Sequence, residues 1–223
     1  MSLTIAMDGP VGAGKSTVAD AVARRLGILH LDTGAMYRAL GLTALRRGID
    51  PMDEDAVRSL CAETEISVRY EGDGQRTLVN GEDVTGLIRT PEVSMAASTV
   101  SRYPEIRKSM VARQQALAAE TDMLLDGRDI CTTVLPNATV KIFLTASPEV
   151  RARRRWKEMQ EKGMPDSFEE VLAELKKRDE QDMNRPVDPL RQAEDAVLVD
   201  TTEIGFDASV EEILRIVEAK RHG

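Results

Sequence analysis

Short apolar runs and amphipathic stretches alternate near the start of the sequence. Residues 3–7 and 28–31 are apolar runs of the length expected for buried strands. Between them, Val18, Val22 and Leu26 recur at helical spacing, with alanines at several of the intervening positions. We therefore predict a strand, a helix and a second strand in that order.

The middle of the chain carries a different pattern. Residues 66–70 alternate between apolar and polar side chains, Asp73 and Gly74 are typical turn residues, and residues 77–79 suit a returning strand. This pattern predicts a small antiparallel β insert at about residues 64–90. A functional insert and a surface excursion are both compatible with it.

The rest of the chain returns to alternating helices and short strands. Further strands are predicted at residues 123–125, 140–144 and 196–199. Helices are predicted at residues 35–47, after Asp53, at 91–101 and 104–119, near Pro148, from Phe168 and around Val210 to Val217. Because buried strands that alternate with helices form parallel sheets covered on both faces, we expect an α/β fold with a parallel five-stranded sheet flanked by helices.

A glycine-rich segment lies between the first predicted strand and the first predicted helix. Its residues are Gly9, Pro10, Val11, Gly12, Ala13, Gly14, Lys15, Ser16 and Thr17. They fit the phosphate-loop template of Gly, any four residues, Gly-Lys and then Ser or Thr. The glycines let backbone N–H groups converge on phosphate oxygens, and the helix N-terminus attracts the same negative charge. We therefore predict a P-loop NTPase fold in which residues 9–17, here called the phosphate loop, bind ATP.

Polar residues follow the carboxyl ends of three predicted strands. The phosphate loop follows the first strand, Asp32 follows the second, and Asp126, Arg128 and Asp129 follow the third. Because parallel α/β sheets bind ligands at this edge, we expect these residues to meet in one crevice.

The same edge carries the predicted metal chemistry. Lys15 supplies a positive charge to the terminal phosphates of ATP, and the Ser16 hydroxyl is placed to bind Mg²⁺. Asp126 suits a second magnesium carboxylate that acts through water, but it also suits a turn before Gly127. The sequence is compatible with both interpretations of Asp126.

Two predicted helices near the C-terminal end are rich in charge. Residues 151–155 include four arginines, of which Arg151, Arg154 and Arg155 lie on one side of the predicted helix. They form either a solvated face or a lid, at about residues 148–166, that brings guanidinium groups over the transferring phosphates. The next helix continues its apolar stripe as Arg178, Asp182 and Arg185. A core-facing stripe that becomes charged predicts a polar cleft, and fraying of the helix before the following proline is the alternative.

Arginines on several elements are sufficient to bind a second phosphorylated ligand. Arg38, Arg107, Arg128 and Arg185 each offer the planar fork that matches a phosphate group. A phosphate acceptor is already an ionised nucleophile. Catalysis then reduces to positioning and to charge neutralisation by Lys15, Mg²⁺ and the arginines.

Composition narrows the class of protein. The 223 residues are 42% hydrophobic and 30% charged, which is typical of one soluble globular domain spanning residues 1–223. A formal net charge of −8 and an aromatic content of 3% oppose broad nucleic-acid binding. No apolar run reaches the roughly 18 residues of a membrane span, and Cys61 and Cys131 have no metal or disulfide spacing. We expect a cytoplasmic monomer that binds neither nucleic acid nor membranes.

Taken together, the motifs closely resemble the bacterial cytidylate kinases within the nucleoside monophosphate kinase family. The similar segments are residues 5–10 with the phosphate loop, 31–38, 81–85, 88–90, 126–130 and 178–185. The β insert corresponds to the enlarged monophosphate-binding region of the bacterial members. Two residues depart from the family pattern, because Ser16 and Cys131 stand where glycine is common.

The resemblance implies transfer of the γ-phosphoryl group from ATP·Mg²⁺ to CMP or dCMP, a step of pyrimidine nucleotide metabolism. It also implies a set of acceptor-binding residues: Arg38, Arg128 and Arg185 on the phosphate, Ser98, Arg107 and Asp129 around cytosine, Arg178 with Asp182 on the sugar, and Thr33. The implied catalytic residues are Lys15, Arg128, Arg154 and Arg185. Asp129 can accept a hydrogen bond from the cytosine amino group, whereas uracil presents a carbonyl there, so UMP is expected to bind poorly.

Two other functions compete with this one. A kinase for UMP or for a non-nucleotide alcohol would share the phosphate loop, although an alcohol acceptor would need a base. A nucleotide-controlled switch that hydrolyses ATP slowly would also share the loop, but it would not depend on CMP.

Overall fold

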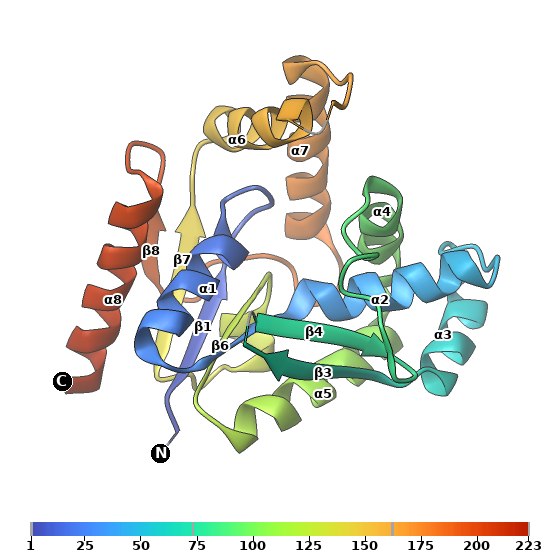
Figure 1. Ribbon diagram of the computed structural model, residues 1–223, viewed down its shortest axis with the longest axis horizontal. Helices are drawn as coiled ribbons and strands as arrows, with labels where there is room; N and C mark the ends of the chain where they lie inside the picture. The colour runs from blue at the N-terminus through green and yellow to red at the C-terminus, as the bar shows by residue number, and fades with distance from the viewer. Residues whose placement is uncertain (1, 73, 162, 223) are drawn as a thin grey trace. The chain divides into compact units, whose positions relative to one another are not determined.

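The computed structural model describes residues 2–72, 74–161 and 163–222 (Figure 1). The chain divides into two compact units, the first made of residues 1–28 and 122–223 and the second of residues 29–121. Asp73 of the predicted turn and Lys162 of the predicted lid lie outside the described residues.

The first unit is built on parallel strands. Strand β1 (Thr4–Asp8) pairs with β6 (Met123–Gly127) on one side and with β7 (Val140–Thr145) on the other, and β7 pairs with β8 (Val197–Asp200). The five-stranded sheet of the chain has the strand order β2-β6-β1-β7-β8, and its strand β2 (Leu29–Asp32) belongs to the second unit. Because β1 lies between β6 and β7, the residues that follow β1 lie between the carboxyl ends of these two strands.

Helices α1 (Lys15–Leu26) and α8 (Phe206–His222) pack beside each other in the first unit (Figure 1). Val18 and Val22 of α1 and Ile213 of α8 share a buried apolar cluster with strand residues such as Ile5 and Ile142. All five side chains are 5% exposed or less. This burial holds the N-terminus of α1 against the end of β1, because the same cluster includes residues of both elements.

Helices α6 (Pro148–Glu161) and α7 (Phe168–Asn184) form a second, smaller packing unit, in which α6 lies across the N-terminal part of α7 (Figure 1). Their apolar contact consists of Ala152, Met159, Val171 and Leu175. Helix α7 starts with a capping box, in which Ser167 and Glu170 satisfy each other's backbone N–H groups. The predicted helices near Pro148 and from Phe168 are confirmed.

In the second unit, the described residues form four helices and the antiparallel insert. The helices are α2 (Thr33–Arg46), α3 (Glu54–Glu63), α4 (Pro91–Val100) and α5 (Pro104–Glu120). Strands β3 (Ile66–Glu71), β4 (Gly74–Val79) and β5 (Glu82–Asp83) pair antiparallel in that order. The predicted β insert is therefore confirmed as a separate three-stranded sheet.

The fold class predicted from the sequence is confirmed, with differences at the ends of elements. The third predicted strand continues from Leu125 through Gly127, and a π-helical turn η1 (Ile130–Val134) follows it without a clear signal in the sequence. Helix α2 begins two residues early, at Thr33, because the Asp32 side chain accepts a hydrogen bond from the Ala35 N–H at 3.1 Å and caps the helix. Among the described residues, no helix combines the length and the apolar character needed to cross a membrane. The single domain, the boundaries of the insert and the lid stay predictions.

Candidate active site

The phosphate loop connects β1 to α1 through glycines in conformations that other residues avoid. Gly9 has a φ of 153°, and a Cβ atom there would lie 1.9 Å from the Leu144 carbonyl oxygen. Gly14 has a φ of 84° and occupies the N-cap position of α1, where no side chain caps the helix. The first N–H groups of α1 are therefore not bound by a capping side chain, which is the arrangement that binds phosphate at a helix N-terminus.

Lys15 lies inside this loop and is 6% exposed. Its ammonium group donates a hydrogen bond to the Pro10 carbonyl oxygen at 2.8 Å. Burial, together with the positive charge of Arg128, lowers the pKa of Lys15 to about 7. A bound phosphate would favour the charged ammonium, so the site is electrostatically suited to an anion.

Ser16 and Asp126 meet at the start of α1. The Ser16 hydroxyl donates to Asp126 Oδ2 at 2.9 Å, and Asp126 is 3% exposed. Because β6 extends through Gly127, Asp126 is a strand residue, and its interpretation as a turn residue is wrong. A hydroxyl and a carboxylate oxygen are hard ligands, which fit Mg²⁺ when phosphate and water supply the remaining positions.

Asp8, the last residue of β1, is fully buried and was not among the site residues predicted from the sequence. Its two carboxylate oxygens accept hydrogen bonds from the backbone N–H groups of Ile130 and Cys131, both at 2.8 Å. Burial, with a contribution from the charge of Asp129, raises the pKa of Asp8 to about 6. Asp8 therefore ties the start of η1 to the strand that precedes the phosphate loop. An aspartate at the end of an apolar run, just before Gly9, was the available signal.

Two ion pairs bring together four of the residues predicted to bind the acceptor. Arg128 Nε donates to Asp182 Oδ2 at 2.8 Å. Arg185 Nη2 lies 3.2 Å from Asp129 Oδ1, with side chains 5% and 9% exposed. We call these four residues the charged cluster. Helix α7 stays helical to Asn184, so the fraying alternative is wrong.

The charges of the cluster act on one another and on the phosphate loop. Burial alone would raise the pKa of Asp182, but the charges of Arg128, Arg178 and Arg185 hold that pKa below its usual value. The charges of Arg128 and Asp182 also affect the titration of Lys15. The charged cluster and the phosphate loop are therefore electrostatically coupled within the first unit.

Arg151 and Arg154, which the sequence assigned to one side of a lid helix, have different hydrogen-bond partners in α6. Arg154 donates to the Thr201 hydroxyl at 3.1 Å and to the Thr201 carbonyl oxygen at 2.8 Å. Arg151 donates instead to the Val11 carbonyl oxygen at 2.8 Å and to Asp179 Oδ2 at 2.7 Å. The structure thus places Arg151, and not Arg154, in contact with the phosphate loop. A role for Arg154 in catalysis stays a prediction.

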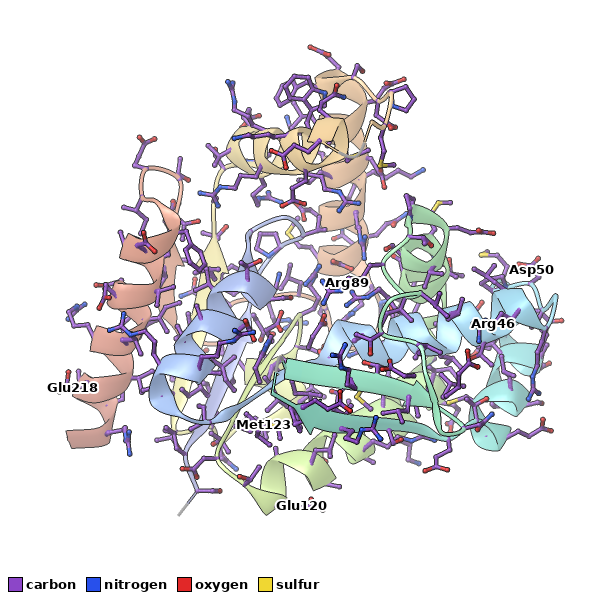
Figure 2. All side chains as sticks on the ribbon, viewed as in Figure 1. Arg46, Asp50, Arg89, Glu120, Met123 and Glu218 are labelled. Carbon is purple, nitrogen blue, oxygen red and sulfur yellow. The ribbon has the colours of Figure 1, made fainter. Side chains whose placement is uncertain are left out.

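The second unit carries its own group of arginines at the start of α2. Arg38 Nη2 donates to Asp32 Oδ2 at 2.6 Å, and Arg89 Nη2 lies 3.4 Å from the same oxygen. Figure 2 shows Arg89 near the N-terminal end of α2, opposite the end that carries Arg46. Thr33, the first residue of α2, is 4% exposed. Asp32 therefore orients the guanidinium groups of both Arg38 and Arg89. Of these two arginines, only Arg38 was predicted from the sequence to bind the acceptor.

Arg107 and Ser98 lie elsewhere in the second unit. Arg107 is 2% exposed, donates to the Ser101 carbonyl oxygen at 3.2 Å and lies over the Tyr37 ring at 5.9 Å from its centroid. Ser98 is half-buried on α4, and its carbonyl oxygen accepts a hydrogen bond from the Ser101 hydroxyl at 3.0 Å. Ser101 thus contacts both residues predicted to surround cytosine in this unit.

Comparison with known proteins shows which family the chain is similar to. The family described as "Cytidylate kinase" matches residues 5–219. The cytidylate kinase of Shouchella clausii (strain KSM-K16) is 50% identical over 214 residues, covering 96% of this chain and 95% of the relative. That of Bacillus subtilis (strain 168) is 46% identical over 218 residues, covering 98% and 97%.

A solved structure supports the fold alone. The gluconokinase of Sinorhizobium meliloti 1021 superposes with a TM-score of 0.50 at 14% identity, covering 97% of this chain and 92% of that one. Since the family match and the near full-length relatives extend over the phosphate loop, the charged cluster and the β insert, the chain belongs to the cytidylate kinase family.

Proposed function

We propose that this protein transfers the γ-phosphoryl group of ATP to CMP or dCMP and releases ADP with CDP or dCDP. The observation that carries the proposal is the charged cluster of two Arg–Asp ion pairs, in which the charges of Arg128 and Asp182 act on Lys15 of the phosphate loop. One unit of this chain thus contains an arrangement suited to a triphosphate donor beside guanidinium groups suited to an anionic acceptor. The family of the chain names the same reaction.

For the donor, we propose that residues 9–17 bind ATP, with Lys15 at its terminal phosphates. Ser16 Oγ and Asp126 Oδ2 lie 2.9 Å apart, and these two residues would hold Mg²⁺, the aspartate through water. When bound, Mg²⁺ would supply neutralisation of the phosphate charge. Removing the divalent ion with a chelator is therefore expected to abolish turnover.

For the acceptor phosphate, we propose binding by Arg38, Arg128 and Arg185. Each of these guanidinium groups is already paired with a carboxylate: with Asp32, Asp182 and Asp129, respectively. These pairs pre-orient the guanidinium forks and leave further N–H donors on each one for a phosphate. Because the acceptor phosphate is an ionised nucleophile, no general base is required, and positioning with charge neutralisation supplies the catalysis.

For the nucleoside, we propose that Ser98, Arg107 and Asp129 contact cytosine and that Arg178 and Asp182 contact the sugar. Thr33 completes the proposed CMP-binding set. The Arg154 guanidinium donates hydrogen bonds to the hydroxyl and the carbonyl oxygen of Thr201. Arg154 would therefore reach the transferring phosphates only after these hydrogen bonds break. We further propose that the protein works as a monomer in the cytoplasm, in pyrimidine nucleotide metabolism.

The test is ADP formation from ATP·Mg²⁺ with CMP, dCMP, UMP, AMP or no acceptor, measured side by side. We expect rapid turnover with CMP and dCMP only, and none after chelation of the metal. Equal slow turnover in every sample would instead indicate hydrolysis without an acceptor and would favour the switch. Rapid turnover with UMP would assign a different acceptor.

A further inference from the structure

Val11, the third residue of the phosphate loop, is held by both of its backbone polar groups. Its N–H donates to Asp179 Oδ1 of α7 at 3.3 Å, and its carbonyl oxygen accepts from Arg151 Nη1 of α6 at 2.8 Å. The backbone at this position therefore has both hydrogen-bond partners outside the loop. Two side chains from α6 and α7 consequently set the orientation of this peptide unit.

The two side chains that hold Val11 also bind each other. Arg151 Nη1 lies 2.7 Å from Asp179 Oδ2, with side chains only 4% and 10% exposed. Arg151 Nε also donates to the Ala146 carbonyl oxygen at 2.8 Å, just after β7. A buried ion pair is weak evidence for stability, because an apolar pair of similar volume often stabilises a fold as well. Its hydrogen bonds to the loop give this pair a use that an apolar pair could not have.

Side-chain packing brings the loop close to the same helices. The Val11 side chain packs against the apolar cluster of α6 and α7. A Cβ atom at Gly12 would lie 3.2 Å from Leu175 and 3.4 Å from the Cβ of Arg151. The phosphate loop therefore fits closely against α6 and α7 at Val11 and Gly12.

We propose that Arg151 and Asp179 are a positioning pair for the phosphate loop, holding Val11 so that the loop keeps the conformation that receives the triphosphate of ATP. They act through the backbone of Val11 and need not touch the reacting atoms. The proposal rests on the proposed function for the identity of the ligand. It assigns a role to two buried charged residues that the proposed ATP and CMP contacts do not use.

The test replaces the pair as a unit, Arg151→Met with Asp179→Leu, because removing one partner alone would leave a buried charge unpaired. Binding of adenylyl-imidodiphosphate with Mg²⁺ is measured by calorimetry, and steady-state kinetics give the KM for ATP and for CMP. We expect the Kd of the analogue and the KM for ATP to rise by about tenfold or more, and the KM for CMP by less than about threefold. Loss of packing alone would not separate the two KM values in this way.

The chain offers a matched control on the same two helices. Glu149 of α6 and Lys176 of α7 form an ion pair at 3.2 Å, but their side chains are 56% and 54% exposed, and the pair has no hydrogen bond to the phosphate loop. The double variant Glu149→Gln with Lys176→Met is expected to bind the analogue within about twofold of the unaltered protein. An equal loss of affinity in this control would overturn the proposal, since the loss would then belong to the α6–α7 contact in general.

A milder variant covers the case in which the double replacement does not fold. Asp179→Asn keeps the side-chain size and an oxygen acceptor for the Val11 N–H but removes the charge that pairs with Arg151. We expect about a threefold loss of analogue affinity and faster hydrogen exchange at the Val11 amide. Unchanged analogue affinity in whichever of the two variants folds would overturn the proposal.

Binding of the ATP analogue does not require an acceptor, which separates this inference from the proposed function. An unaltered protein that binds the analogue but phosphorylates neither CMP nor dCMP would contradict the proposed function and leave the positioning pair to be judged by its own variants. Conversely, full CMP kinase activity with unchanged analogue binding in the Arg151→Met, Asp179→Leu variant would contradict only the positioning pair.

Discussion

At the scale of single residues, Asp8 just before the phosphate loop and Lys15 inside it are buried charges whose pKa values are moved in opposite directions. Burial raises the pKa of Asp8 to about 6 and lowers that of Lys15 to about 7. In each case the surroundings disfavour the charged form until a partner compensates. Asp8 finds partial compensation in two backbone N–H groups, and the phosphate of a nucleotide would provide it for Lys15.

The raised pKa of Asp8 predicts a specific dependence of stability on pH. The folded protein keeps the Asp8 proton to a higher pH than the unfolded chain does, so this stabilising contribution is present at low pH and is lost as the pH rises through about 6. Between pH 7 and pH 5, we expect the free energy of unfolding of the unaltered protein to rise by about 1 kcal/mol relative to Asp8→Asn. Urea titrations of both proteins at each pH measure it. A difference that stays constant over this range would contradict the assignment.

Asp129 carries a prediction about specificity. If its carboxylate accepts from the cytosine amino group, Asp129→Ala should reduce the preference for CMP over UMP by about 1–3 kcal/mol, measured as the ratio of kcat/KM values. A ratio is the right quantity, because loss of the partner of buried Arg185 will also lower stability.

The companion variant Asp129→Asn sharpens this test. An amide can turn its NH₂ group toward the uracil carbonyl, so we expect the Asn variant to accept UMP better than the Ala variant does. Unchanged discrimination in both variants would remove Asp129 from the base site.

At the scale of elements, close packing and caps decide where helices lie. In the second unit, α2 and α4 approach so closely at Gly41 that a Cβ atom there would lie 2.9 Å from the Ala97 backbone nitrogen and 3.1 Å from the Ala96 Cβ. This glycine stands in the middle of a helix, where glycine ordinarily destabilises. Its place is explained by the neighbouring helix and not by its own backbone.

Gly41→Ala is therefore expected to destabilise the protein although alanine is the better helix former. Overpacking of a tight interface costs about 1–3 kcal/mol, and only about 1 kcal/mol of helix propensity offsets it. Gly205→Ala, just before α8, is a control without a steric contact, because nothing lies within 4 Å of a Cβ atom at that position. Chemical denaturation of both variants measures the change. A Gly41→Ala protein as stable as the control would show that α2 and α4 can separate without cost.

At the scale of the whole molecule, net charge is a poor guide to the binding of anions. The chain has a formal net charge of −8, and many of its ion pairs, such as Arg25–Glu211 and Arg58–Asp55, are exposed and contribute little. Two arginines proposed to bind the acceptor are buried, since the whole residues Arg107 and Arg185 are 2% and 8% exposed. An acidic net charge and buried arginines therefore coexist in one chain, because salt screens the exposed charges at a distance, whereas buried charges are screened much less.

The sequence by itself determined the features that depend on local chemistry. The glycines around Val11, the apolar strands and the alternation in residues 66–70 each specify a local backbone conformation, so the phosphate loop, the α/β fold and the β insert were predicted correctly. The charged stripe ending at Arg185 likewise indicated a polar environment, because helical periodicity alone shows which face a residue shares.

Only the tertiary structure decided how the charges are paired. Arg151 and Asp179 are 28 positions apart, and Asp8 is 122 positions from Ile130, so no local pattern links them. Composition also could not separate Arg151, which holds the phosphate loop, from Arg154, which binds Thr201 three residues further along the same helix. The physical reason is that the path of the chain in three dimensions determines which group lies beside a buried charge. A periodic pattern shows which residues share a face of a helix or strand, but not which element packs against that face.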